Sequence, residues 1–283
     1  MHIVKFQGGL GNQMFQYALY RKFQSMGYDT YADLYHYRQK KYETRPLQLS
    51  VFGIDLREAD RADVIQLSGN EDRWFDIVWL KHIGKKTYYR EKDISYKEEI
   101  WKMTNGYFHG FWQSEKYFYD IEDILRNEFV LSDTVQFDLV NRQMQLKIKE
   151  DQKAVSVHIR RGDYLENPMY GGICTEEYYK KAIDYIKQRV ENAKFYLFSN
   201  DMPYVQDRFR GEEFVYVENN SEDKGYIDLY LMSLCKHHII ANSSFSWWGA
   251  WLNAAKSKIV VAPSIWLTNA PARDVVPDTW IRC

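Results

Sequence analysis

The stretch Val157-His158-Ile159-Arg160-Arg161-Gly162-Asp163-Tyr164 decides the fold of this chain. It ends an apolar, β-prone run, 154–159, and releases two arginines into a glycine-containing loop. Arginine is always charged, and its planar fork of donors suits phosphate oxygens. Because parallel sheets bind ligands beyond the carboxyl ends of their strands, the stretch predicts an anion site at such an edge. The plain alternative is a solvated turn with two surface arginines, and Arg161-Gly162-Asp163 alone is too short to indicate cell adhesion.

Three further observations favour the anion site over the plain turn. His158 shares a strand face with Arg160, which favours a functional role over a core role for this histidine. The segment Phe198-Ser199-Asn200-Asp201 follows the next predicted strand, where it either meets a ligand or caps a helix. The run Asn242-Ser243-Ser244-Phe245-Ser246 follows another strand and opens an apolar helix, and it holds more polar residues than a cap needs. Together these segments predict a phosphate site built without a P-loop lysine.

The amino terminus carries a second loop of interest, Gly8-Gly9-Leu10-Gly11-Asn12-Gln13. Its glycines permit close backbone approach, and Asn12 is expected to cap a helix running to about residue 26. The loop is either ligand-facing or a plain tight turn. A dinucleotide fingerprint, with Asp33 on the ribose, is a further alternative. Met14 argues against a nicotinamide or flavin, because it stands where the third glycine should pack against the strand.

Strands alternate with helical segments along most of the chain, which predicts βαβ units and parallel sheets. In the first half we expect strands at 3–6, 30–32 and 106–112, and helices near 58–67, 93–101, 114–119 and 121–128. In the second half we expect strands at 154–159, 195–199, 214–217, 238–241 and 258–262, with helices at 176–190, 203–209, 225–237 and 246–255. The fold class is therefore α/β, with two Rossmann-like domains facing a cleft. The charged segment 144–153 sets the expected boundary, giving domains at 1–150 and 151–283.

Composition excludes some partners. The 283 residues carry 38 basic and 39 acidic side chains, so no global field favours nucleic acid. Aromatic residues make up 17% of the chain, a content that suits stacking on sugars or bases but also ordinary packing. Three widely spaced cysteines, Cys174, Cys235 and Cys283, predict neither a disulfide framework nor structural zinc. Cys235 is expected in the core.

The expected location is cytoplasmic. No signal peptide precedes the first strand, and no run approaches the roughly 18 apolar residues of a membrane span. We expect a protein without a transmembrane segment whose membrane contact, where it occurs, is peripheral to the inner membrane. The chain also contains no Asp-x-Asp pair to hold a metal on a sugar nucleotide. A diphosphate leaving group would then depend on arginine and helix dipoles, and no metal or cofactor is expected.

The chain resembles the α-1,2-fucosyltransferase family. The resemblance runs in order from the first residues to about residue 250, through Gly8–Ala18, Gly110–Phe118, His158–Tyr164, Phe198–Asp201 and Ser243–Gly249. It implies a metal-independent GT-B fold and an inverting enzyme that transfers fucose from GDP-β-L-fucose to the 2-hydroxyl of a terminal β-galactoside. The C-terminal domain would bind GDP-fucose and the N-terminal domain the acceptor. The chain is similar to bacterial members that build surface polysaccharide, O-antigen or lipopolysaccharide, in which the acceptor glycan is carried on a lipid.

The resemblance also implies site residues. Arg160 would bind the β-phosphate as the main catalytic contributor, and His158 would lie along the nucleotide. Asp228 would accept from the guanine N–H groups. Asn12 and Gln13 would face the fucose or the acceptor, and Asp163 is a candidate catalytic carboxylate, with Glu166 and Asp33 as other possible bases. The expected donor-binding residues are His158, Arg160, Arg161, Asn200, Asp201, Asp228, Asn242, Ser243, Ser244, Phe245 and Ser246. Another GDP-sugar transferase, a dinucleotide-dependent oxidoreductase and a non-catalytic glycan-binding protein remain as alternatives.

Overall fold

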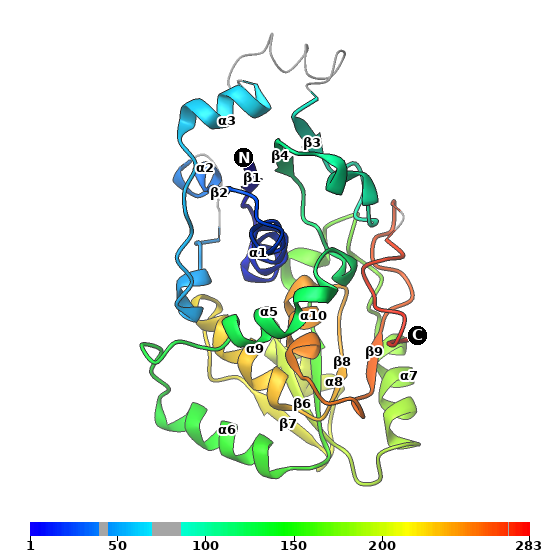
Figure 1. Cartoon of the computed structure of the whole chain (residues 1–283). Helices are drawn as coiled ribbons and strands as arrows, with labels where there is room; N and C mark the ends of the chain where they lie inside the picture. Colours follow the sequence, from blue (N-terminus) through cyan, green and yellow to red (C-terminus); the bar gives the residue numbers. More distant parts are fainter. Residues whose placement is uncertain (40–44, 70–85, 271) are drawn as a thin grey trace. The chain divides into compact units, whose positions relative to one another are not determined.

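The computed structural model describes residues 1–39, 45–69, 86–270 and 272–283 of the chain (Figure 1). It divides into two compact units, Met1–Val130 and Leu131–Cys283. Each unit contains a parallel sheet with helices, so the predicted succession of two Rossmann-like α/β units, the plan of a GT-B fold, is confirmed. The expected boundary at residue 150 lies about twenty residues too late. Segment 144–153 belongs mostly to a helix, α6 (Leu139–Glu150), which packs on a helix of the second unit.

The first unit holds a four-stranded sheet in the order β2-β1-β4-β3. All neighbouring strands are parallel. β2 lies on one side of β1, and β4 and β3 lie on the other, so the switch point of this sheet is between β1 and β4. Its strands are β1 (His2–Lys5), β2 (Thr30–Asp33), β3 (Tyr88–Arg90) and β4 (Gly106–His109); its helices are α1 (Leu10–Ser25), α2 (Tyr35–Arg38), α3 (Arg61–Ser68) and α5 (Glu122–Glu128), with 3-10 turns at Leu49–Phe52, Glu98–Lys102, Glu115–Tyr117 and Tyr119–Ile121.

Helix α1 forms as its apolar spacing predicts, because the residues at that spacing form one fully buried stripe against β1 and β2. These residues are Met14, Phe15, Ala18, Leu19 and Phe23. The expected cap is wrong: Gly9 is the N-cap and Asn12 lies inside the first turn. The left-handed Gly8 (φ 81) turns the chain early enough for the helix to begin at Leu10.

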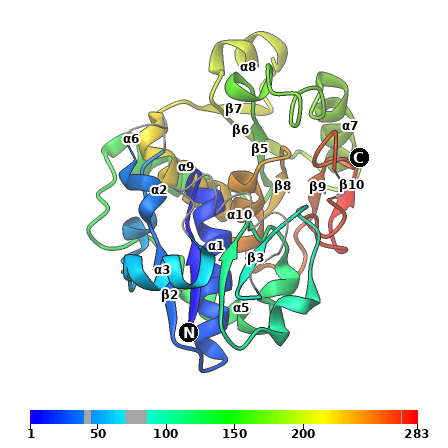
Figure 2. The same ribbon diagram turned by 90° about the horizontal axis from the view of Figure 1, so that it is seen from above.

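The second unit holds a six-stranded parallel sheet in the order β10-β9-β8-β5-β6-β7 (Figure 2). Counted from β5, this is the 3-2-1-4-5-6 order of a dinucleotide-type Rossmann sheet, with its switch point between β5 and β8. The strands are β5 (Ala154–Ile159), β6 (Lys194–Ser199), β7 (Phe214–Val217), β8 (His237–Ile239), β9 (Val260–Ala262) and β10 (Ile281–Arg282); the helices after α6 are α7 (Glu176–Lys187), α8 (Met202–Arg208), α9 (Gly225–Leu234) and α10 (Ser244–Leu252), with 3-10 turns at Gly162–Tyr164 and Glu222–Lys224.

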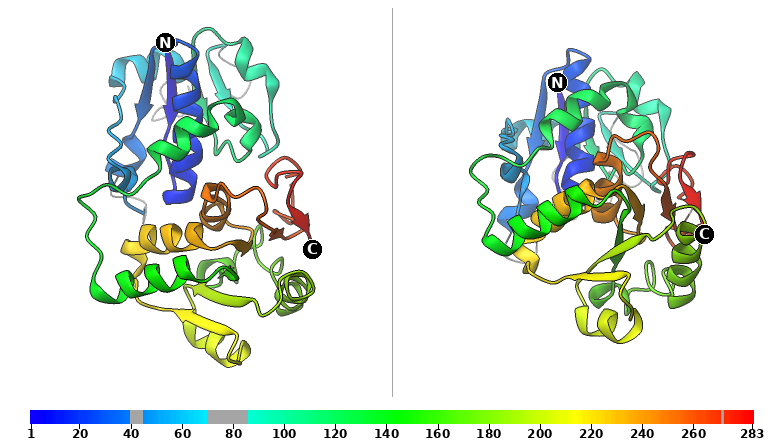
Figure 3. Two further views of the ribbon diagram at one scale, coloured as in Figure 1. Left: turned by 60° about the horizontal axis from the view of Figure 1, so that its bottom comes forward. Right: turned by 90° about the horizontal axis from the view of Figure 1, so that it is seen from below.

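Helices cover both faces of this sheet (Figure 3). The apolar side chains of β5 and β6 pack with α7 and α8 into one buried cluster. On the other face α10 packs against α9, and α9 against α6. Trp247 joins α10 to the C-terminal segment: its indole donates to the carbonyl of Val275 at 2.7 Å, and its ring lies 5.4 Å, centroid to centroid, from that of Trp280.

Candidate functional site

The predicted anion-binding segments meet at one edge of the second unit. β5 and β8 are hydrogen-bonded neighbours, and β6 pairs with β5 on its other side. Arg160 follows β5, Asn200 follows β6, and the 242–246 run follows β8, so all three lie at carboxyl ends around the switch point. In open α/β sheets this crevice is where ligands bind.

His158 and Arg160 form the centre of this edge. The His158 ring is 5% exposed and lies 5.6 Å, centroid to centroid, from the Phe245 ring at the start of α10. Burial, reinforced by the Arg160 charge, lowers the pKa of His158 to about 3, so the imidazole is neutral at physiological pH. Its Nδ1 is buried and has no hydrogen-bond partner among the described residues. The Arg160 guanidinium stacks on Tyr164, 5.3 Å from the ring centroid.

The amino terminus of α10 supplies the second part of the edge. Ser243 is the N-cap in extended conformation, but its side chain makes no capping hydrogen bond. The first intrahelical bond runs from the Trp247 N–H to the Ser243 carbonyl at 3.0 Å, which leaves Ser244, Phe245 and Ser246 in the first turn. First-turn N–H groups have no intrahelical acceptor, and together with the helix dipole they attract anions. Ser243, Ser244 and Phe245 therefore lie at a helix start, and their binding of a phosphate stays a prediction.

Two members of the same run have structural partners instead. Asn242 is 2% exposed, and its amide donates to the carbonyls of Tyr170 (3.2 Å) and Trp266 (3.3 Å) while its oxygen accepts from Cys174. Ser246 is 1% exposed, and its hydroxyl lies within 3.4 Å of the Ala241 carbonyl and 3.3 Å of the Ser243 carbonyl. Their expected contact with the donor is therefore corrected: both hold the loop in shape.

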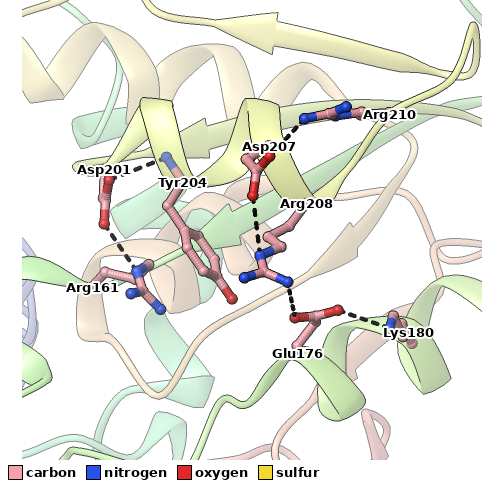
Figure 4. Close-up of polar contacts among 8 residues, drawn as sticks. All are labelled: Arg161, Glu176, Lys180, Asp201, Tyr204, Asp207, Arg208 and Arg210. Atoms are coloured by element: carbon pink, nitrogen blue, oxygen red, sulfur yellow. Dashed lines mark hydrogen bonds and ion pairs between the residues drawn. The ribbon is translucent and has the colours of Figure 1, made fainter.

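Arg161 and Asp201 form an internal brace (Figure 4). The Arg161 Nε donates to Asp201 Oδ2 at 2.9 Å, and its guanidinium lies 3.5 Å from the centroid of the Tyr204 ring. Asp201 also caps α8 by accepting from the Tyr204 N–H at 3.3 Å. An arginine already paired and stacked in this way shapes the loop that carries Arg160. Contact of Arg161 and Asp201 with the donor stays a prediction.

Asn200 ties the same loop to β6. Its Oδ1 accepts from the Arg161 N–H at 2.9 Å, and its amide nitrogen lies against Gly162, which is left-handed at φ 49. A Cβ on Gly162 would collide with that amide. The loop therefore requires glycine here both for its backbone and for its contact with Asn200.

We predict that Gly162→Ala lowers the free energy of unfolding by about 1–2 kcal/mol, from the left-handed backbone, and weakens turnover further by displacing Asn200. Thermal unfolding and initial rates of the expected sugar transfer measure the two effects. Gly172→Ala is the matched control, since Gly172 is left-handed at φ 73 with nothing within 4 Å of its Cβ position. Equal rates in the two variants would contradict a role for the Asn200 contact.

Asp228, on the first turn of α9, belongs to a partly buried network of hydrogen-bonded amide side chains. Its Oδ1 accepts from Asn220 at 2.6 Å, and Asn220 exchanges hydrogen bonds of 2.8 and 3.1 Å with the fully buried Asn141 of α6. Burial raises the pKa of Asp228 to about 7, although the Asn220 hydrogen bond opposes the shift. Gly225, three residues earlier, lies against the Phe245 ring. That contact places the start of α9 beside the start of α10.

The first unit has an analogous edge above β1 and β4. Asn12 is half-buried there, and its Oδ1 accepts from Gln113 Nε2 at 2.8 Å. Gln13 does not face a ligand, which is a correction. Its side chain is fully buried, donates to the carbonyls of Gly8 (3.0 Å) and Pro46 (2.8 Å), and accepts from the Gln48 N–H at 2.8 Å.

The carboxylates considered as general bases differ in their exposure to solvent and in their hydrogen-bond partners. Asp33 is 6% exposed and accepts from the Tyr107 hydroxyl at 2.6 Å and the Tyr35 N–H at 2.9 Å, so it serves neither as a base nor as a ribose ligand. Glu166 is exposed on the loop after β5. The side chain of Asp163 lies outside the described part of the structure. The sequence analysis assigns no role to Glu91, or to Gln113 within the family-like stretch Gly110–Phe118; the pairing of β3 with β4 brings these two residues to one edge.

No group of three His, Cys, Asp or Glu side chains suited to a metal ion occurs in the described ranges. The three cysteines are free thiols, and Cys235 is buried as expected. No helix among the described residues is long and apolar enough to cross a membrane.

Comparison with known proteins shows to which family the chain belongs. The chain is 35% identical to an alpha-1,2-colitosyltransferase of Escherichia coli, over 99% of this chain and 98% of that protein. It is 33% identical to the O-antigen biosynthesis glycosyltransferase WbnK of Escherichia coli, over 97% and 98%. Among solved structures it is similar to the NodZ alpha-1,6-fucosyltransferase soaked with GDP-fucose, with 17% identity over 89% and 91% of the two chains and a TM-score of 0.44. The sequence profile of glycosyl transferase family 11 matches residues 65–280. The chain belongs to glycosyl transferase family 11, and the resemblance to the α-1,2-fucosyltransferases is confirmed.

Proposed function

We propose that this glycosyltransferase moves L-fucose from GDP-β-L-fucose to the 2-hydroxyl of a terminal β-galactoside. The observation that carries the proposal is the meeting of Arg160, His158 and the α10 amino terminus at the switch point of a Rossmann-ordered sheet. This edge offers a fixed cation, a neutral imidazole and first-turn N–H groups, a set that fits a nucleoside diphosphate. Family membership leaves the oxidoreductase and glycan-binding alternatives without support.

The proposed reaction is a single displacement with inversion. The acceptor oxygen forms a bond to the fucosyl C1 as the bond from C1 to the β-phosphate oxygen breaks, and GDP departs. Arg160 and the α10 amino terminus stabilise the negative charge that grows on the diphosphate. The proton of the acceptor hydroxyl passes to a carboxylate such as Asp163 or to the departing phosphate. With this arrangement no metal is required.

Asp228 is the proposed guanine ligand. Guanine presents N1–H and an exocyclic amino group side by side, and a carboxylate accepts from both. Gly225 and Phe245 bring the start of α9 and the start of α10 together, so base and diphosphate subsites adjoin in one unit. We expect His158, which lies beside Phe245, to contact the nucleotide between its base and its diphosphate.

A second donor, GDP-colitose, has specific support in the 35% identical colitosyltransferase. Colitose is L-fucose without its 3-hydroxyl. A site built to hydrogen-bond that hydroxyl rejects the deoxy sugar by about 10⁴-fold, whereas an apolar pocket discriminates by only about 10²-fold. Direct competition between the two donors therefore tells the two sites apart.

The proposed setting is O-antigen assembly on the cytoplasmic side of the inner membrane, with a galactose-terminated, lipid-linked acceptor and peripheral membrane contact. Its support is the 33% identical O-antigen glycosyltransferase.

The deciding experiment measures GDP release in EDTA from GDP-fucose, GDP-colitose and GDP-mannose, with and without a panel of β-galactosides. We expect galactoside-dependent release with GDP-fucose in EDTA, and a product linkage at the 2-hydroxyl by NMR. Preferred release from GDP-colitose would reassign the donor within the same site. Loss of all release in EDTA, restored by Mg²⁺ or Mn²⁺, would reject metal-independent transfer, and failure to bind GDP at all would reject the donor site.

A further inference from the structure

The turn that follows β4, residues 110–113, has an unusual backbone. Trp112 is fully buried and left-handed, with φ 58, although it carries a large side chain. Such a conformation persists only where its surroundings hold it, and it is found most often at functional sites. This turn ends β4 at His109, three residues before the end of the strand expected at 106–112.

Glu91 holds this turn in place. It follows β3, and its own N–H donates to the His109 carbonyl at 2.8 Å. Its Oε2 accepts from the N–H of Phe111 at 2.6 Å and from that of Trp112 at 3.3 Å. Gly110 gives the carboxylate its room, because a Cβ there would lie 2.6 Å from Glu91 Cβ. Glu91 thus fastens both residues that precede Gln113.

The turn held by Glu91 places Gln113 beside the loop after β1. Gln113 Nε2 donates to Asn12 Oδ1 at 2.8 Å. The two loops are tied a second time by the fully buried Gln16, which donates to the carbonyls of Gly110 and Gln7 at 3.2 Å each. Gly8 completes the arrangement, because a Cβ there would lie 2.7 Å from the Asn12 amide nitrogen. A buried frame therefore sets an amide pair at the switch point between β1 and β4.

The chemistry of this pair suits a sugar. Carboxamides donate and accept without charge, which matches hydroxyl groups, and the amide pair itself carries no cation for a phosphate. We propose that Glu91 is a positioning residue for acceptor binding: it locks the turn at 110–113 and so aims Gln113 at Asn12, forming an amide pair that binds hydroxyl groups of the acceptor sugar. This rests on the proposed transfer to a glycan. Glu91 Oε1 is buried from solvent, so Glu91 acts through the turn rather than on the reacting atoms.

Steady-state kinetics with both substrates varied test the proposal on full-length Glu91→Ala, Glu91→Gln and Gln113→Ala. Glu91→Ala and Gln113→Ala are expected to raise the acceptor KM about tenfold or more, while the GDP-fucose KM and GDP affinity stay within about twofold. Glu91→Gln keeps an oxygen that accepts from the same N–H groups, so its acceptor KM should stay within about threefold of wild type. The acceptor KM of the double variant Glu91→Ala/Gln113→Ala should be no higher than that of the more affected single variant, because both substitutions act through the same turn.

Glu98→Ala removes an exposed carboxylate in the same unit and is the control. Equal loss of donor and acceptor affinity in Glu91→Ala, or an unchanged acceptor KM in Gln113→Ala, would overturn the inference. If Glu91→Ala does not fold, Gln113→Ala and Glu91→Gln carry the test. A wild-type enzyme without galactoside-dependent GDP release would instead reject the proposed function, a result distinct from any split between the two KM values.

Discussion

Replacing Arg160 by lysine is expected to lower kcat for sugar transfer by about 10²–10³, comparable to removing one donor from an oxyanion-type site. Lysine keeps the positive charge but loses the planar fork, so it cannot make two parallel hydrogen bonds to the departing diphosphate. It also loses the stacking of the guanidinium on Tyr164, which sets the direction of the side chain. The effect should fall on kcat more than on the donor KM, because charge on the diphosphate grows in the transition state.

Initial rates of GDP release, with folding checked by thermal unfolding, measure this effect. Arg189→Lys is the matched control, since Arg189 stacks on Tyr185 in the same unit, away from the carboxyl edge of the sheet. Turnover close to wild type in Arg160→Lys would remove Arg160 from its catalytic role. A large loss in Arg189→Lys would show that the assay reports stability rather than chemistry.

The sequence predicts the second unit better than the first, and the reason is physical. Strand β5 was expected at 154–159 and occurs there, because a fully buried parallel strand is a continuous apolar run whose end is marked by charge. In the first unit the 93–101 helix is only a 3-10 turn at Glu98–Lys102, and β3 was missed. Aromatic side chains stabilise that region by packing with one another, which leaves no helical or strand period to read.

The candidate site divides in the same way. Arg160, His158 and Ser243 lie at the expected edge, because strand ends and helix starts locate such an edge from sequence alone, whereas the role of Asp228 comes from the family resemblance. Asn242 and Gln13 could not be separated from them. A polar side chain that shapes a loop and one that binds a ligand have the same composition, and only the hydrogen-bond partners tell them apart. Glu91 shows the converse, because it follows β3, a strand that the sequence does not reveal, while its hydrogen-bond partners lie at the end of β4 and in the turn after it.

Asp228→Asn is expected to raise the Kd for GDP about 10²-fold or more. The carboxylate can accept two charge-assisted hydrogen bonds, from the N1–H and the amino group of guanine. An asparagine accepts only one of them, and its own NH₂ group faces the other donor of the base. The selectivity for GDP over ADP should fall with it. Calorimetric titration with both nucleotides measures the change. Asp184→Asn, an exposed aspartate on α7, is the control.

The pH dependence of GDP binding tests whether Asp228 is the carboxylate that binds guanine. Because burial raises the pKa of Asp228 to about 7, the unliganded protein favours the protonated form and loses this contribution to stability as pH rises from about 4 to about 7. Guanine binding requires the ionised form, so below pH 7 GDP must displace a proton and its Kd should rise about tenfold per pH unit. The phosphate of GDP titrates near pH 6 in every variant, and Asp228→Asn isolates that background. The GDP-induced increase in Tm should therefore grow from pH 5.5 to pH 8 in the wild type by more than in Asp228→Asn. Parallel curves for the two proteins would place the guanine elsewhere.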